Sequence, residues 1–300
     1  MTAGKVTGKV AGLDAARLAP MLRPMLARVA VRFYNFVHGT LGLPGAGWLL
    51  RRLARFLPGL RSAPLHIEGV GTAQLDLRDL AAYSLLNFSL GEPDNHQRLL
   101  ELMVQALPPG GVFWDVGANV GLVSAHLARS AANPSAVHAF EPVPGPRSTL
   151  ESLFSDHPFV RVHPFGLGAK DETLTIQYCP DSSSLNSLRR ALPGGQPVQI
   201  QIRRGDTLRA EFSLPAPHVI KVDVEGFEPE VFAGLAGTIA EARPVIFYEH
   251  IMLSDEQVRA LTPAGYTLRF QLEDGTLVED IARRMDGHNA VLWPPGHALA

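Results

Sequence analysis

The sequence predicts an α/β fold in which a mostly parallel sheet is covered by helices on both faces. Short apolar runs alternate with helical stretches from about residue 112 onward, and this alternation favours a parallel sheet. The first run leads directly into a glycine-spaced turn and then a helix, as in loops that bind nucleotide-type ligands. These two observations together predict a Rossmann-like domain with a ligand at one edge of its sheet.

The composition agrees with a globular α/β chain. With 300 residues, 46% hydrophobic and 19% charged, the chain can form one large domain with an extension, and disordered or fibrous classes are excluded. Cys179 is the sole cysteine, so neither an intrachain disulfide nor a cysteine-rich zinc site can form. A reducing, cytoplasmic environment is therefore expected.

Residues 1–61 are expected to form a basic, amphipathic helical extension. Ten Lys and Arg against Asp14 alone give it a formal charge of +9, and because the whole chain carries −2, the remainder carries −11. The arginines alternate with Leu, Val and Phe, which favours contact with an anionic membrane surface or a partner protein over a nucleic-acid arm. The plainer alternative is a helical cap on the fold. No nucleic-acid partner is expected.

The same region does not have the pattern of a spanning or exported segment. Its longest uncharged run, Phe33–Leu50, is interrupted by Pro44 and four glycines and is barely long enough to span a bilayer. Residues 1–20 mix Gly, Lys, Asp and Arg where a signal peptide would have a compact apolar stretch. An intracellular protein is predicted, with peripheral attachment at the inner membrane face as the alternative to a purely cytoplasmic location.

Residues 62–300 are expected to form the main domain, and residues 62–110 lead up to its core. Apolar and polar side chains alternate in 65–68 and in 73–77 on either side of a glycine-containing turn, which predicts a β-hairpin. A helix is expected over 95–107, where the apolar side chains share one face before a Pro-Pro-Gly-Gly break.

The core, residues 111–300, should contain the alternating elements. Strands are expected at 112–116, 137–140, 160–165, 218–224, 244–248, 266–272 and 290–293, and helices at 148–154, 228–240, 254–261 and directly after Gly121. The runs 173–178 and 198–202 interrupt the alternation as an inserted hairpin, of a kind that often shapes a substrate pocket. The last two strands are expected to pair antiparallel.

The glycine-spaced turn is the candidate cofactor loop. Gly117 and Gly121 follow the buried run 112–116, and because glycine tolerates positive φ the backbone there can approach a ligand closely. Glu141 ends the next strand, twenty residues after Gly121, where a carboxylate can accept hydrogen bonds from both ribose hydroxyls. The order strand, loop, helix, strand, acid indicates a nucleoside-containing cofactor.

Asp115 distinguishes between two such cofactors. A carboxylate just before the turn would repel a pyrophosphate but attract a cationic sulfonium or ammonium group, and the three-glycine pattern of NAD enzymes is not present. S-adenosyl-L-methionine is therefore expected, with S-adenosylhomocysteine as product. The alternatives are an NAD-dependent oxidoreductase and a non-catalytic Rossmann-like binding protein; in the plainest case Asp115 only caps the turn and Glu141 is a solvated strand end.

Three separated motifs resemble those of the FkbM-type S-adenosylmethionine-dependent methyltransferases. They read DVGANVG at Asp115–Gly121, FEP at Phe140–Pro142 and IKVDVEG at Ile220–Gly226. The resemblance covers residues 65 to 293 and leaves out the basic extension. It implies a class I sheet of seven strands in the order 3-2-1-4-5-7-6, and O-methylation of a hydroxyl on a sugar, glycolipid or secondary metabolite. The expected cofactor contacts are Asp115, Gly117, Ala118, Asn119, Gly121, Glu141, Pro142 and Asp223.

Four titratable residues are expected at the reacting end. Ligands lie beyond the carboxyl ends of parallel strands, so Asp223 and Glu225 after one strand, and Glu249 and His250 after the next, should face the transferred methyl group. One of them would accept the hydroxyl proton, for a rate gain of roughly 10² to 10⁴, and His250 has the best matched ordinary pKa. Two alternatives stay open: a divalent cation on these side chains, which is not favoured, and a buried core position for His250.

Overall fold

An eight-stranded sheet forms the centre of the computed structural model, which describes residues 15–91, 97–183 and 195–296. The strand order is β12-β11-β13-β10-β9-β3-β4-β5. The bounds are β3 (Val112–Val116), β4 (Ala136–Phe140), β5 (Val160–His163), β9 (Val219–Val222), β10 (Val245–Glu249), β11 (Thr267–Gln271), β12 (Leu277–Val278) and β13 (Asn289–Trp293). Five neighbouring strands, from β10 to β5, run parallel, which confirms the predicted fold class.

The sheet order reproduces the expected one with one addition. Following the chain, β3, β4, β5, β9, β10, β11 and β13 occupy the places of the expected strands 1 to 7, and the two-residue β12 extends the edge beside β11. Strand β13 pairs antiparallel with both β10 and β11, so the predicted antiparallel pairing of the last two runs is confirmed. The expected seven strands are thus one fewer than the eight that the sheet contains.

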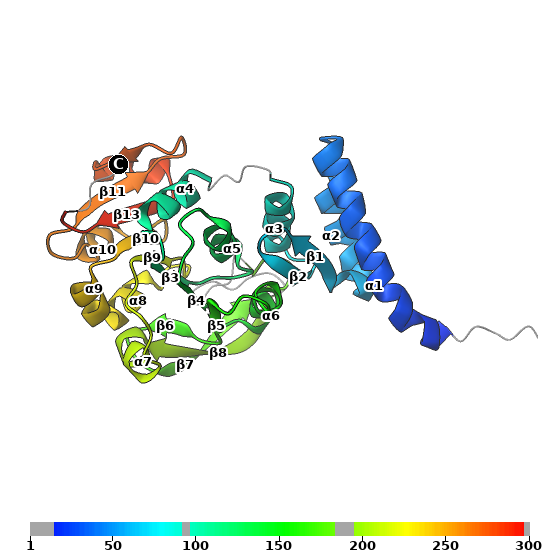
Figure 1. The fold of residues 1–300 in the computed structure, drawn as a ribbon, viewed down its shortest axis with the longest axis horizontal. Helices are drawn as coiled ribbons and strands as arrows, with labels where there is room; N and C mark the ends of the chain where they lie inside the picture. The colour runs from blue at the N-terminus through cyan, green and yellow to red at the C-terminus, as the bar shows by residue number, and fades with distance from the viewer. Residues whose placement is uncertain (1–14, 92–96, 184–194, 297–300) are drawn as a thin grey trace, which may run out of the picture.

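Helices cover the two faces of the sheet (Figure 1). One face packs against α4 (Gln97–Ala106), α5 (Leu122–Arg129) and α6 (Pro144–Leu153), and the other against α7 (Gly205–Glu211), α8 (Glu228–Gly234), α9 (Ala236–Ala242) and α10 (Asp255–Ala260). Neighbouring strand residues alternate between the two cores: Phe113 lies in the first and Trp114 in the second, both fully buried.

The predicted helix over 228–240 is divided into α8 and α9. Helix α8 ends at Gly234, and α9 begins after Leu235. A Cβ added to Gly234 would lie 1.9 Å from the carbonyl oxygen of Gly168. The close approach of two backbones therefore sets the position of this break.

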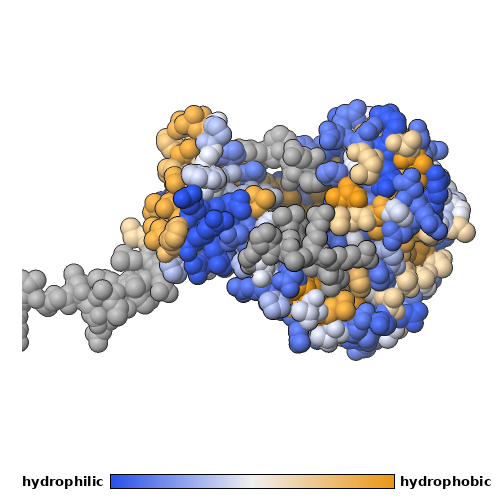
Figure 2. Space-filling view, turned by 180° about the vertical axis from the view of Figure 1, so that it is seen from behind, coloured by the Kyte–Doolittle hydropathy of each residue, from blue (hydrophilic) through white to orange (hydrophobic). Residues whose placement is uncertain are grey.

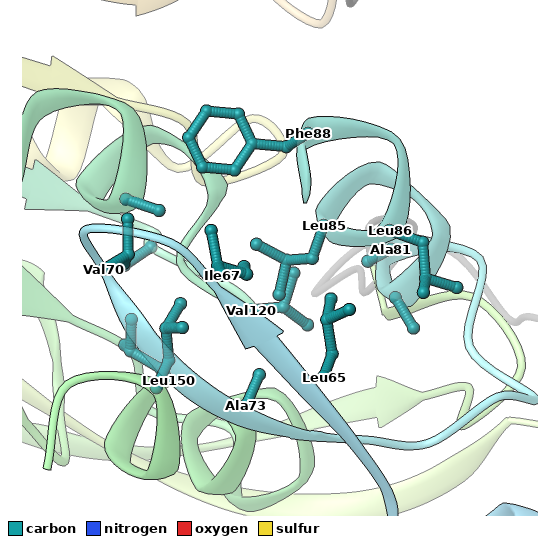
Figure 3. Packing of buried hydrophobic residues seen from close by; sticks show 14 of the residues in the cluster. Leu65, Ile67, Val70, Ala73, Ala81, Leu85, Leu86, Phe88, Val120 and Leu150 are labelled. Carbon is teal, nitrogen blue, oxygen red and sulfur yellow. The ribbon is translucent and has the colours of Figure 1, made fainter. Parts of the chain in front are cut away.

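Two smaller sheets flank the main one. The predicted hairpin is confirmed as β1 (Ala63–Ile67) and β2 (Gly71–Leu75), and it packs with α3 (Ala81–Ser89), α6 and Val120 of the loop after β3 (Figure 3). The inserted hairpin is also confirmed, as β7 (Glu172–Tyr178) and β8 (Gln196–Arg204). The short strand β6 (Gly166–Gly168), which the sequence pattern did not predict, joins β8 in parallel.

The basic extension contributes α1 (Ala15–Tyr34), the π-helix η1 (Asn35–Thr40), α2 (Ala46–Phe56) and the short 3-10 helix η2 (Pro58–Leu60). Helices α1 and α2 contact each other and stand at one end of the molecule beside the hairpin (Figure 1). Residues 1–14 of the predicted extension lie outside the described residues. None of the helices in the described part of the chain combines the length and apolar character that crossing a bilayer requires.

Candidate functional site

A cavity of about 480 Å³ lies at the carboxyl edge of the parallel strands. The neighbouring strands are β13, β10, β9, β3 and β4 in that order. The cavity is lined by the residues that follow the four parallel strands and by His288, which precedes the antiparallel β13. Its volume is in the range of small-molecule sites. A second, more apolar groove of about 600 Å³ between α8, α9 and α10 contains none of the predicted site residues, so the predicted chemistry belongs to the cavity at the sheet edge.

The loop after β3 brings backbone and carboxylate groups together. Gly117 has φ +85°, and a Cβ there would lie 1.9 Å from the carbonyl oxygen of Asp223, so only glycine lets the loop meet the end of β9. Asn119, also left-handed with φ 50°, donates its backbone N–H to Glu141 Oε2 over 2.8 Å. Glu141 Oε1 accepts the N–H of Val143, also over 2.8 Å. The Glu141 carboxylate is thus fixed in place with lone pairs left for a ligand.

Burial has a clear effect on Glu141. Its side chain is 5% exposed, and desolvation raises its pKa to about 7, although the two backbone N–H donors and the guanidinium of Arg147 oppose the shift. A group of this kind is stabilised as a carboxylate when ligand hydroxyls donate to it. Glu141 therefore has the position and the unused acceptor capacity that the sequence predicts for a ribose partner.

The structure does not bring Asp115 to the cavity. Asp115 is the fourth residue of β3, is 1% exposed, and accepts a 2.6 Å hydrogen bond from the hydroxyl of Ser124 in α5. Burial raises its pKa to about 6. Its contact with Ser124 holds the first turn of α5 against the strand, and no side chain caps the start of that helix. The expected direct contact with a sulfonium group is not supported, because the side chain points into the packed core.

Three carboxylates meet at the other side of the cavity. Oxygen atoms of Asp223, Glu225 and Glu249 all lie within 4.8 Å of one another. Lys221, a buried residue of β9, places its Nζ 2.8 Å from Asp223 Oδ2. Burial is the largest cause that raises the pKa of Glu249 to about 8, and the negative charges of Asp223 and Glu225 add to it. Glu249 therefore holds its proton to a higher pH than an ordinary glutamic acid, and the Lys221 side chain lies beside Asp223.

The turn after β9 is held in an uncommon conformation. Glu225 has φ 54°, a left-handed value that side-chain-bearing residues seldom adopt, and Gly226 follows with φ 94°. Glu228, 1% exposed, accepts the backbone N–H groups of Val224 and Gly226 through Oε1. Strained residues persist where the surroundings fix them, and they concentrate at functional sites. Glu228 thus positions the turn that carries Glu225.

His250 does not reach the cavity either. It is fully buried, stacks edge-on against Phe270 and places Nδ1 3.3 Å from a guanidinium nitrogen of Arg284. Burial lowers its pKa to about 4, so it is neutral at physiological pH. Successive side chains along a strand point to opposite sides, and since Glu249 faces the cavity, His250 must face the core. The core-histidine alternative describes it correctly.

The cavity also contains residues outside the predicted catalytic and cofactor-binding set. His288 is exposed, lines the cavity and accepts the backbone N–H of His250 through its carbonyl oxygen. Ser183 belongs to the serine-rich stretch that follows β7; its hydroxyl donates to Asn119 Oδ1 over 2.8 Å, while Ser184 to Ser187 lie outside the described residues. The apolar lining includes Val143, Leu167, Ile176, Ile200, Ile202 and Phe227.

The predicted site residues therefore fall into two groups. Those that line the cavity are Gly117, Asn119, Glu141, Pro142, Asp223, Glu225 and Glu249. Those that the structure places behind it are Asp115, Ala118, Gly121 and His250. Gly121 acts through packing, since a Cβ there would lie 2.5 Å from a methyl carbon of Leu150.

The donor set fits a nucleoside with a cationic substituent. Glu141 offers oxygen acceptors beside the apolar side chains of Val143 and Leu167, which suits a ribose and an aromatic base. The carboxylates of Asp223 and Glu225 lie toward β9 and β10, where a positive charge is stabilised.

Residues 115–288, more than half of the chain, match the family model described as the methyltransferase FkbM domain. Hexuronic acid methyltransferase AglP of Haloferax volcanii is 30% identical over 165 residues, which cover 55% of this chain and 66% of that protein. The 31-O-demethyl-FK506 methyltransferase FkbM of Streptomyces tacrolimicus is 29% identical over 164 residues, 43% of this chain and 61% of that protein.

Among solved structures, the methyltransferase FkbM of Methylobacillus flagellatus aligns with a TM-score of 0.44 and 17% identity, over 71% of this chain and 54% of that chain. The chain spans just under two thirds of the length of the curated relatives named above. The match of the family model over the residues that build the cavity, from Asp115 to His288, shows that this chain belongs to the FkbM methyltransferase family.

Proposed function

We propose that this enzyme methylates a hydroxyl oxygen of a polar small molecule or glycan whose reacting end is uncharged. The observation that carries the proposal is the acidic side of the cavity, where Asp223, Glu225 and Glu249 converge. A carboxylate-bearing acceptor would be repelled if its charge lay beside these groups, whereas a hydroxyl can donate a hydrogen bond to any of them.

The cofactor would be held by the residues along the β3, β4 and β9 ends. Gly117 and Asn119 offer the backbone surface, Glu141 and Pro142 the ribose side, and Asp223 a carboxylate toward the cationic end. Ala118, Gly121 and Asp115 act from behind, by fixing the loop on its strand and helix. When bound, S-adenosylmethionine supplies an electrophilic methyl group on a positively charged sulfur.

Glu249 is the proposed general base. It lines the cavity, and its raised pKa of about 8 lies near physiological pH. A base with such a pKa has a high affinity for a proton and is still partly deprotonated. Asp223 is engaged by Lys221, and Glu225 is fixed in a strained turn. A hydroxyl is a much weaker acid than a carboxylic acid. Glu249 would therefore take up the hydroxyl proton only while the bond between the acceptor oxygen and the methyl carbon forms. Alignment of the acceptor would provide most of the rate.

The names of two relatives support an oxygen acceptor. One relative is named for methylation of a hexuronic acid and the other for a 31-O-demethyl precursor, which places the methyl group on oxygen. A sugar or a hydroxylated secondary metabolite is therefore the acceptor class proposed here. If the acceptor is a uronic acid, its carboxylate should point away from Glu225 and Glu249.

The test is methyl transfer from isotopically labelled S-adenosylmethionine to a panel of neutral glycosides, uronic acid glycosides, hydroxylated polyketides and amines, with the product bond assigned by NMR. We expect O-methylated products. Exclusive N-methylation, or cofactor binding without transfer to any hydroxyl acceptor, would overturn the proposal. A parallel assay with EDTA, and with added magnesium, addresses the alternative use of the same carboxylates. Because Lys221 already pairs with Asp223, we expect the rate to be independent of metal.

A further inference from the structure

The helices α1 and α2 carry a large exposed apolar surface. In α1, Leu26, Val29 and Phe33 are spaced by three and four residues, so they share one helix face, and all three are exposed. The opposite face of the same helix is also apolar: Ala27 and Val31 are buried there, against the core that includes the hairpin. A helix that is apolar on both sides is normally covered on both sides.

The second helix repeats this arrangement. Leu50 and Ala54 are buried, while Trp48 is 65% exposed and Phe56 is 76% exposed. These two aromatic residues are eight positions apart and therefore lie on one face of α2. Figure 2 shows the hydrophobic residues gathered along the outer edge of this end of the molecule. Further exposed apolar side chains on the same two helices and their connection are Met25, Phe36, Leu41, Leu43, Leu49 and Leu53.

Charge is distributed on these helices with one sign. Residues 15–61 contain eight arginines and no acidic residue. Arg51 and Arg55 fix α2 to the body: Arg51 donates to the carbonyl oxygen of Asp181 over 2.9 Å, and Arg55 forms a 2.8 Å ion pair with its carboxylate. Arg28 and Arg32 are exposed beside the apolar face of α1, and so is Arg52, whose guanidinium lies 5.6 Å from the centre of the Trp48 ring.

We infer that this outer surface of α1 and α2 binds the interface of a membrane that contains anionic lipids. Exposed apolar and aromatic side chains would enter the boundary between headgroups and acyl chains, while Arg28, Arg32 and Arg52 would contact lipid phosphates. The helices lie in the plane of the membrane and do not cross it. A second copy of the chain is a poorer occupant. A two-fold interface would place these arginines against their own equivalents, with no acidic residue in 15–61 to pair with them.

Trp48 offers a direct probe. Of the three tryptophans in the chain, Trp114 and Trp293 are buried and Trp48 is exposed. Vesicles of phosphatidylcholine mixed with phosphatidylglycerol should therefore shift the tryptophan emission to shorter wavelength and protect it from acrylamide. Pure phosphatidylcholine should do so much less, and high salt should weaken the effect. Trp48→Phe should remove the spectral change while the protein still sediments with the mixed vesicles.

Three variants of the full chain complete the test by co-sedimentation. Trp48→Ser/Phe56→Ser should lower the affinity for mixed vesicles about tenfold or more, from loss of apolar burial. Arg28→Glu/Arg32→Glu should do so by about tenfold or more, from loss of charge attraction. Met285→Ser, a matched exposed apolar position, 62% exposed on η4 (Ile281–Asp286), should bind as the wild type does. Thermal unfolding shows that each variant is folded.

Two results would overturn the inference. One is a wild-type chain that does not bind mixed vesicles, or whose binding both double variants leave unchanged. The other is a wild-type dimer in solution that Trp48→Ser/Phe56→Ser converts to a monomer, since this surface would then be an interface between two copies. If the aromatic double variant does not fold, the salt dependence of the wild type and the arginine variant still decide the matter.

Discussion

Single side chains at the acidic side of the cavity have different surroundings although they lie close together. Lys221 neutralises Asp223 at 2.8 Å, and Glu249 keeps a proton near neutral pH because burial and two neighbouring carboxylates raise its pKa to about 8. Glu225 extends from a left-handed backbone position, with φ 54°. The pKa of Glu249 is thus raised toward physiological pH, which is the property a general base requires.

Glu249→Gln isolates this property, since it preserves size and removes the basic group. We expect kcat to fall by roughly 10² to 10⁴, while S-adenosylhomocysteine binding, measured by calorimetry, changes little. In the wild type the rate should rise with pH as Glu249 loses its proton. The midpoint in the saturated complex should lie below the free-enzyme value of about 8, because a cationic cofactor lowers the pKa. The variant should lose that inflection; a wild-type rate and pH profile in Glu249→Gln would exclude the role.

The two histidines near β10 should respond differently to substitution. His250→Ala removes a fully buried side chain packed on Phe270 and Arg284, so we expect a loss of roughly 2 to 5 kcal/mol in the free energy of unfolding, with kcat per folded molecule retained. His288→Ala changes an exposed residue of the cavity wall and should alter kcat or KM with little change in melting temperature. Thermal unfolding and steady-state kinetics on both variants distinguish the cases, and the opposite pattern would refute the assignment.

Residue types could be predicted from the sequence better than side-chain directions. Strand ends identified Asp223, Glu225 and Glu249, and all three line the cavity. His250 was misplaced because neighbouring residues of a strand alternate in direction, and only one of the pair 249 and 250 could face the ligand. His288 was missed although the signal existed: a strand antiparallel to β10 begins at the edge where β10 ends, so the residue before β13 belongs to that edge.

The loop between β3 and α5 is the element on which cofactor binding should depend most. Gly117→Ala places a Cβ 1.9 Å from the Asp223 carbonyl oxygen, so the loop and the end of β9 must separate. We expect the S-adenosylhomocysteine dissociation constant to rise at least tenfold, roughly 1.4 kcal/mol. Gly110→Ala is the matched control: its φ is also positive, +72°, but no atom lies within 4 Å of the added Cβ, so it should lose only about 1 kcal/mol of stability and bind normally. If both substitutions raised the dissociation constant equally, the cause would be backbone strain at a positive φ and not the contact with Asp223.

Helices and strands could be predicted from the sequence where buried residues recur periodically. The predictions were wrong where two backbones contact each other. The strands of the main sheet appear as short apolar runs because both of their faces are covered. Strand β6 reads Gly-Leu-Gly and has no such run; its glycines are needed because a Cβ at Gly168 would lie 2.6 Å from a side-chain carbon of Ile202. The division between α8 and α9 depends on the contact of Gly234 with the same residue, Gly168. Contacts of this kind join segments far apart in the chain and leave no local pattern.

At the scale of the whole molecule, the α1–α2 end and the cavity differ in the sign of their charged residues. The α1–α2 end carries arginines without acids, and the cavity carries carboxylates. Burial of acids at the sheet edge should make stability depend on pH. Carboxyls with raised pKa values include Asp115, at about 6, Glu141, at about 7, and Glu249, at about 8. Their ordinary values are 3.8 and 4.5, so between pH 4 and 8 the folded state binds more protons than the unfolded state, and stability falls as pH rises.

Three buried histidines act in the opposite direction over a narrower range. The pKa values of His138, His163 and His250 are lowered from 6.5 to about 4, mainly by burial. Between these limits the unfolded chain binds more protons, so the histidines make stability rise with pH up to about 6.5. The two effects oppose each other below pH 6.5, and only the carboxyls act above it.

The melting temperature should therefore change little between about pH 5 and 6.5 and decline from there to about pH 9. Glu249→Gln should make the upper decline shallower, because the amide carries no charge to desolvate, whereas Glu273→Gln, at an exposed position, should follow the wild type. S-adenosylmethionine should also reduce the decline, since its positive charge stabilises the deprotonated carboxylates and binding to the folded state adds to stability. Melting curves across this range test the argument. A melting temperature that does not fall between pH 7 and 9 would mean that the carboxyls lose their protons at their ordinary pKa values. The acidic side of the cavity would then favour a bound cation over a protonated Glu249.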